Sequence, residues 1–158
     1  MSSQLVLISL LIFAASAASV SFEDCGSLYS LDAVDIDGCD VSTEPCPLLR
    51  GQEVNVTIRF QSGFRSEQLR PNVFITQFNV DTHLVVTPDD CRALLYPVCP
   101  IVPGQNALYK AKLVVSPNLA LIEGTLTWKL HSDSTQNLIC MRTEVIIGPE
   151  VEPHGKGF

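Results

Sequence analysis

Apolar and polar residues alternate along most of the chain with a period of two, the pattern of a strand with one buried face and one solvent-facing face. In residues 53–61, every even position from Val54 to Phe60 is apolar and every odd position is polar or charged. This alternation predicts a strand over residues 53–61. Similar patterns predict further strands over residues 28–37, 72–80, 83–86, 108–115, 123–131 and 138–147.

Segments rich in Gly, Pro, Asn and Asp separate these strands, and no stretch of ten or more residues keeps a helical period. About seven strands in a single domain of this length predict an all-β fold, an antiparallel β-sandwich of two sheets. Periodicity alone leaves a barrel as the alternative. We predict one domain over residues 19–148 and a flexible tail over residues 149–158, where the alternation is lost.

An uncharged apolar run from Leu5 to Ala18 precedes the predicted domain. It ends in Ala15-Ser16-Ala17, the small-x-small pattern at which signal peptidase cuts, and it is short for a membrane span. We therefore interpret residues 1–18 as a signal peptide. The mature chain is expected outside the cell or in the lysosomal lumen.

All six cysteines follow the predicted cleavage site, so they enter an oxidising compartment where three disulfides can form. Six cysteines allow fifteen pairings, and spacing does not choose among them. A zinc site is the alternative, but the chain has no CxxC spacing and its three histidines are scattered. The simplest guess joins sequence neighbours first, which gives Cys39–Cys46, Cys91–Cys99 and Cys25–Cys140.

The net charge of -7 and the pI near 4.8 argue against nucleic acid and anionic membrane surfaces as partners. The acidic series Asp32, Asp35, Asp37 and Asp40 does not match a calcium-binding loop, and phosphate-binding and nucleophile motifs are missing from the sequence. We therefore predict no catalytic residue, no metal, no cofactor and no enzymatic activity. The sequon that begins at Asn55 falls on the outward side of its strand, which predicts a glycan on Asn55.

The motifs FEDCG, C-x6-CP, GQxVNVT and PDDC-x7-CPI follow one another along the chain, before Trp128 and the LIC that ends at Cys140. In this order they resemble the ML lipid-recognition family, and within it the secreted Niemann-Pick type C-like branch and its arthropod relatives, including the mite group-two allergens. The resemblance implies an immunoglobulin-like sandwich with the three disulfides given above. It also implies an apolar cavity between the two sheets.

Any sandwich needs inward apolar residues, so each such residue taken alone is explained by the core. The resemblance is what implies a ligand site. Two positions depart from sterol-carrying relatives, because His83 and Met141 stand where those relatives often have aromatic residues. The residues that the resemblance places around the cavity are Val56, Ile58, Phe60, Phe78, Val80, Leu84, Val85, Tyr109, Leu113, Val115, Leu119, Leu126, Trp128 and Met141.

The resemblance implies a secreted lipid-binding and lipid-transfer protein that holds a sterol, a fatty acid or a similar apolar molecule between its sheets. Ligand hand-over implies a membrane or receptor partner. Three alternatives stay open: a chemosensory carrier of apolar semiochemicals, an innate-immunity module that recognises lipid, and an interaction sandwich with a filled core.

Overall fold

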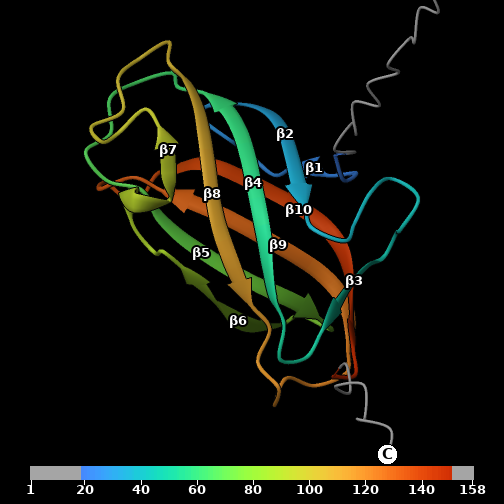
Figure 1. Cartoon of the computed structure of the whole chain (residues 1–158). Helices are drawn as coiled ribbons and strands as arrows, with labels where there is room; N and C mark the ends of the chain where they lie inside the picture. The colour runs from blue at the N-terminus through green and yellow to red at the C-terminus, as the bar shows by residue number, and fades with distance from the viewer. Residues whose placement is uncertain (1–18, 151–158) are drawn as a thin grey trace, which may run out of the picture.

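The structure is a computed structural model that describes residues 19–150, so the predicted signal peptide and residues 151–158 of the predicted tail lie outside the described residues. The regular secondary structure of the described chain is nearly all strand, as predicted (Figure 1). Its elements are β1 (Glu23–Asp24), β2 (Ser30–Ile36), β3 (Cys46–Leu49), β4 (Glu53–Gln61), β5 (Arg70–Gln77), β6 (Val80–Thr87), the 3-10 helix η1 (Cys91–Ala93), β7 (Leu94–Tyr96), β8 (Asn106–Val114), β9 (Glu123–His131) and β10 (Asn137–Gly148).

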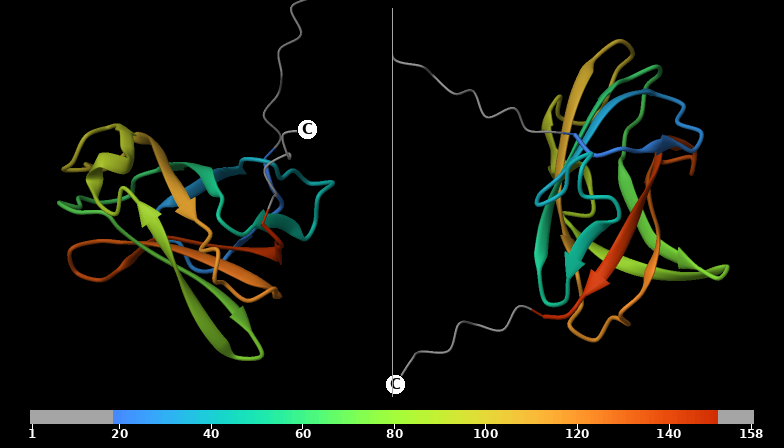
Figure 2. Two further views of the ribbon diagram at one scale, coloured as in Figure 1. Left: turned by 60° about the horizontal axis from the view of Figure 1, so that its bottom comes forward. Right: turned by 90° about the vertical axis from the view of Figure 1, so that its right-hand side faces the viewer.

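The strands form two facing layers, which confirms the predicted sandwich (Figure 2, right). The first sheet has the order β1-β10-β9-β5-β6, with β3 added beside β10. The second sheet has the order β6-β8-β4-β2, with β7 added beside β8. The seven predicted strands correspond to the seven longest, and the short strands β1, β3 and β7 were not predicted.

Strand β6 belongs to both sheets and joins them along one edge. Its first part pairs with β5, from Val80 opposite Gln77 to Leu84 opposite Val73. Its last part pairs with β8 and begins where Val85 lies opposite Val114. The two layers are therefore one continuous ten-stranded sheet that folds over at β6.

The N-terminal segment, residues 19–24, connects the sheets along the opposite edge. The backbone N–H of Val20 donates to the carbonyl of Val34 on β2 at 3.0 Å, and the Ser19 hydroxyl donates to the Asp35 carboxylate at 2.9 Å. Four residues later the same segment becomes β1 and pairs with β10 in the first sheet. Both long edges of the sandwich are thus closed.

Almost all strand pairs are antiparallel, and the exception is β3, which pairs in parallel with β10. The predicted antiparallel sheets are therefore confirmed apart from this one parallel pair. The reason for the parallel pair is the path of the chain, because it leaves β2 in the second sheet, crosses to the first sheet through the loop that Cys39–Cys46 closes, and enters β3 in the direction of β10. The disulfide therefore stabilises a crossing between the sheets.

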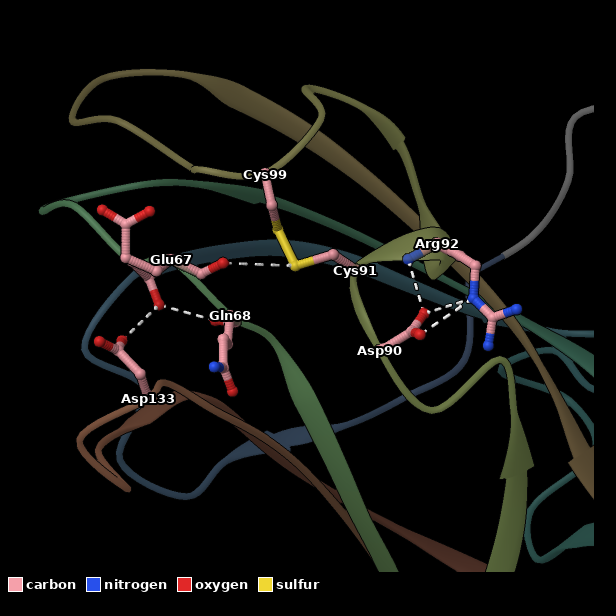
Figure 3. Close-up of a disulfide and its surroundings, with 8 residues drawn as sticks. Glu67, Gln68, Asp90, Cys91, Arg92, Cys99 and Asp133 are labelled. Carbon is pink, nitrogen blue, oxygen red and sulfur yellow. Dashed lines mark hydrogen bonds and ion pairs between the residues drawn. A yellow bond between two sulfur atoms is a disulfide. The ribbon is translucent and has the colours of Figure 1, made fainter.

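All three disulfides have the predicted pairing. Cys25–Cys140 joins the chain just after β1 to the first part of β10, across 115 residues of sequence. Cys91–Cys99 spans only eight residues and links η1 to the loop after β7. Figure 3 shows its sulfur atoms beside the loop that carries Glu67, whose carbonyl lies 3.8 Å from the Cys91 sulfur. This disulfide therefore fixes the loops at one end of the sandwich.

Candidate functional site

The apolar space between the sheets is the region to which the sequence analysis assigned a ligand. Ten of the fourteen predicted lining residues lie buried there, and nearly all of them are exposed to solvent by no more than 1%. They come from four strands and from the residues that follow β8. These ten residues, called the interior cluster below, are Val56, Ile58, Phe60, Tyr109, Leu113, Val115, Leu119, Leu126, Trp128 and Met141.

Alternation along the strands explains why these residues converge. On β4 the residues on either side of Ile58 are Thr57 and Arg59, and they point away from the interior while Ile58 is fully buried. Trp128 on β9 stands beside Met141 on β10, because the two residues are paired in register. The strand pairing therefore supplies the interior cluster from both sheets.

Three predicted lining residues lie elsewhere, and for them the prediction is wrong. Phe78 is 90% exposed, because residues 78 and 79 form the two-residue turn between β5 and β6 instead of continuing a strand. Val80 is 64% exposed at the first position of β6, beside this turn. Val85 is 62% exposed because it follows Leu84 directly, and neighbouring residues of a strand face opposite sides.

Leu84 is the remaining predicted residue, and it packs against the core while only partly buried. Other inward residues were not predicted, notably Val73 and Ile75 on β5 and Val145 on β10. The alternation that predicted these strands contained the signal, since Val73 and Ile75 stand two residues apart. Their side of the sheet could not be assigned without the strand pairing.

The turn between β5 and β6 gives one end of the sandwich an apolar surface. Phe78 and Asn79 have φ of 49° and 62°, a left-handed conformation that a bulky residue such as Phe rarely adopts. Leu121, which is 57% exposed, lies in the loop that joins β8 to β9 at the same lower end of the sandwich in Figure 1. We call Phe78, Val80 and Leu121 the apolar end.

Open hollows occur on the outer faces of the sheets. One of about 680 Å³ lies on the outer face of the first sheet, where Thr76, Thr125 and Arg142 line it. Another of about 670 Å³ is lined by Val85, Leu95 and Lys110. Neither includes a residue of the interior cluster. In this structure the side chains of the interior cluster are buried against one another, so a ligand between the sheets requires them to move apart.

Electrostatically the interior is neutral. The buried polar residues among those described are all serines and threonines, and no charged residue is buried there. Two polar atoms of the interior cluster, the Tyr109 hydroxyl oxygen and the Trp128 indole nitrogen, have no hydrogen-bond partner within residues 19–150. Burial raises the pKa of the Tyr109 hydroxyl far above its ordinary value, and the nearby Trp128 side chain offsets part of this shift. The phenol is therefore neutral at every physiological pH.

The predicted glycosylation position lies on the outer surface. Asn55 faces outward on β4, as predicted, and its side-chain amide donates to the Asp37 carboxylate at 2.7 Å. Within residues 19–150, no three His, Cys, Asp or Glu side chains are placed to hold a metal ion. No helix in the same part of the chain has the length and apolarity needed to cross a membrane.

The fold and its interior define a disulfide-bonded β-sandwich whose apolar core is shared by two sheets. The model of the ML domain family matches residues 19–147, and the chain belongs to this family.

Curated relatives are similar along nearly their whole length. The chain is 33% identical over 144 residues to the NPC intracellular cholesterol transporter 2 of Danio rerio, covering 90% of this chain and 93% of the relative. The protein of the same name from Mus musculus is 31% identical over 144 residues, covering 90% of this chain and 94% of the relative.

A solved structure shares the fold. The crystal structure of a Niemann-Pick type C2 protein from Japanese carpenter ant superposes with a TM-score of 0.70 at 20% sequence identity. It covers 81% of this chain and 99% of the ant protein.

Proposed function

We propose that this protein is a lipid carrier that binds a sterol, a fatty acid or a similar apolar molecule between its two sheets and makes no covalent change to it. The observation that carries the proposal is the uncharged interior cluster, supplied by both sheets of an ML domain. Its relatives named as cholesterol transporters support a sterol or sterol-like ligand. Neither catalysis nor a cofactor has a role in this function.

Burial of apolar surface supplies the binding free energy. Each methylene group taken out of water contributes about 0.8 kcal/mol, so a long chain or a ring system offsets the cost of association. Met141 adds adaptability, because its unbranched side chain fills irregular spaces. Because β6 and residues 19–24 link the sheets along both long edges, the space opens at an end of the sandwich.

The apolar end suits the transfer of ligand to a membrane or a receptor. Phe78 occupies a strained turn position and contributes little to the core, so its near-complete exposure suggests a role outside the fold. Strand β6 carries both Val80 of the apolar end and Leu84, which packs partly buried against the core. One strand therefore connects the apolar end to the interior. Three disulfides support function in an oxidising compartment, outside the cell or in the lysosomal lumen.

The test is native mass spectrometry of the protein secreted by cells of its own type, followed by solvent extraction and identification of the bound molecule. We expect one apolar molecule per chain. A sterol supports transport between membranes, whereas a small volatile compound supports a chemosensory carrier. A protein that is isolated empty and binds neither cholesterol nor oleate contradicts the proposal.

A further inference from the structure

The interior contains a pair of polar groups that the apolar core does not need. Tyr109 on β8 and Trp128 on β9 come from different sheets, and their rings meet edge to face with centroids 6.2 Å apart. Both side chains are completely buried. Hydrogen-bonding interaction with the Trp128 indole offsets part of the rise in the Tyr109 pKa, but the geometry between the two groups falls short of a hydrogen bond and leaves both atoms without a full partner. Arg50 Nε and His131 Nε2 are the other unpaired buried side-chain atoms among the described residues, and both belong to side chains that are only partly buried.

Two other buried hydroxyl groups show the usual arrangement with a partner. The hydroxyl of Tyr29, a second buried tyrosine, donates to the carbonyl of Phe64 at 2.6 Å. Thr143 faces the interior from β10 and donates to the carbonyl of Ser21 at 2.8 Å. A buried polar group without a partner costs free energy and calls for an explanation. In a protein that binds a ligand between its sheets, the ligand itself can be the missing partner.

The chemistry of the two groups defines that partner. An indole N–H can only donate a hydrogen bond, and a tyrosine hydroxyl both donates and accepts. Together they present two donors to one oxygen atom. A carboxylate is disfavoured at this position, because the buried residues of the described chain include no cation to compensate its charge.

We propose, resting on the proposed function, that Tyr109 and Trp128 select neutral oxygen-containing lipids whose carbonyl or hydroxyl group reaches the middle of the sandwich. Ketones, esters and alcohols belong to this class. Hydrocarbons of the same length leave both donors unsatisfied. Carboxylates are accommodated only if their charged head stays near the protein surface, away from the pair.

Competition against the fluorescent probe N-phenyl-1-naphthylamine tests the selection. The competitors are hexadecane, 8-hexadecanone and hexadecanoate, which have the same chain length and differ in oxygen content. We expect the ketone to bind about tenfold more tightly than the alkane, the ratio that two modest hydrogen bonds supply. In Tyr109→Phe the preference should fall to about threefold, because one donor is lost.

Tyr29→Phe is the matched control, because it also removes one buried hydroxyl but one that already has a partner. It should keep the tenfold preference. An unchanged preference in Tyr109→Phe, or equal affinities of the wild type for ketone and alkane, overturns the proposed selection by Tyr109 and Trp128. The proposed function as a lipid carrier would still stand. If neither the probe nor any competitor binds the folded wild type, the proposed function fails and the selection fails with it.

A second measurement reads the pair directly. Trp128 is the only tryptophan of the chain, so the single indole N–H resonance in a nitrogen-15 correlation spectrum belongs to it. The ketone should shift the indole proton downfield by forming a hydrogen bond, and hexadecane should not. The same shift with both competitors would show that the indole responds to filling of the core rather than to the oxygen atom, and would overturn the proposal.

Discussion

Gly124 on β9 lies directly against the backbone of Thr76 on β5, so closely that a Cβ atom at position 124 would come within 2.6 Å of the Thr76 carbonyl oxygen. The same atom would lie 3.1 Å from a methyl group of Ile75. A backbone carbonyl in a paired strand cannot move aside without breaking its hydrogen bonds. Glycine at this position therefore allows β5 and β9 to approach.

Replacement of Gly124 by alanine should lower the free energy of unfolding by about 2 kcal/mol, because overpacking forces the strands apart. Urea denaturation measures the loss. Gly63→Ala is the control, since a Cβ atom there meets its nearest neighbour at 3.5 Å, an ordinary contact. Equal stabilities of the two variants would contradict the steric argument.

The two buried tyrosines should respond in opposite directions to loss of their hydroxyl groups. Tyr109→Phe removes a buried hydroxyl without a partner and should raise the free energy of unfolding by about 1 kcal/mol. Tyr29→Phe removes the hydrogen bond to Phe64 and should lower it by about 1 kcal/mol. Thermal denaturation of the ligand-free variants compares them, and destabilisation of both would show that the Tyr109 hydroxyl has a partner after all.

Tyr109 also predicts how stability depends on alkaline pH. Burial raises the pKa of its hydroxyl above the ordinary value of 10.0, so the unfolded chain releases this proton at a lower pH than the folded chain does. Its contribution to stability is complete below pH 10.0 and declines above it by about 1.4 kcal/mol per pH unit. Urea denaturation at pH 9, 10 and 11 should show a steeper decline for the wild type than for Tyr109→Phe, and parallel declines would refute the assignment.

The disulfides should differ in how much each adds to the free energy of unfolding, according to the length of the loop that each closes. In the chain-entropy model, Cys25–Cys140 with its separation of 115 residues contributes about 5 kcal/mol, and Cys39–Cys46 with its separation of seven contributes about 2 kcal/mol. The paired serine variants, C25S/C140S and C39S/C46S, test this by urea denaturation. A greater loss in the second variant would mean that the crossing between sheets matters more than chain entropy.

A glycan on Asn55 should be detectable without loss of the fold. Release by an amidase that cleaves N-linked glycans should reduce the mass of the secreted protein, and the variant Asn55→Gln should show no such reduction. Attachment replaces one of the two amide hydrogens of Asn55, and even loss of its 2.7 Å hydrogen bond to Asp37 should cost little, because that bond is exposed. The unglycosylated variant should keep the wild-type affinity for lipid, because Asn55 points away from the interior.

The sequence predicted the strands of the fold more completely than the residues around its ligand site. The boundaries of β4 and β9 were predicted to the residue, because their alternation is uninterrupted. The turn at Phe78 and Asn79 escaped prediction, since the left-handed backbone there carries no glycine to signal it. Because the turn was not predicted, Phe78 and Val80 were expected inside the sandwich, whereas both are exposed in the structure.

Prediction from the sequence was also limited because contacts between distant strands cannot be read from it. The unpaired state of Tyr109 and Trp128 depends on which residues face them from the opposite sheet, and a single sequence does not contain that information. The short strand β3 is held by pairing with β10, almost one hundred residues later. The sequence of β3, CPLL, is too short to show that it pairs with a distant strand.

The shared strand β6 also has a consequence for unfolding. A sandwich of two separate sheets can in principle lose one sheet before the other. Here the pairing of Leu84 with β5 and of Val85 with β8 makes neighbouring residues members of different sheets, so neither sheet can melt without disturbing the other. Unfolding should therefore be a single cooperative transition, and a lipid bound between the sheets should raise the melting temperature of both together.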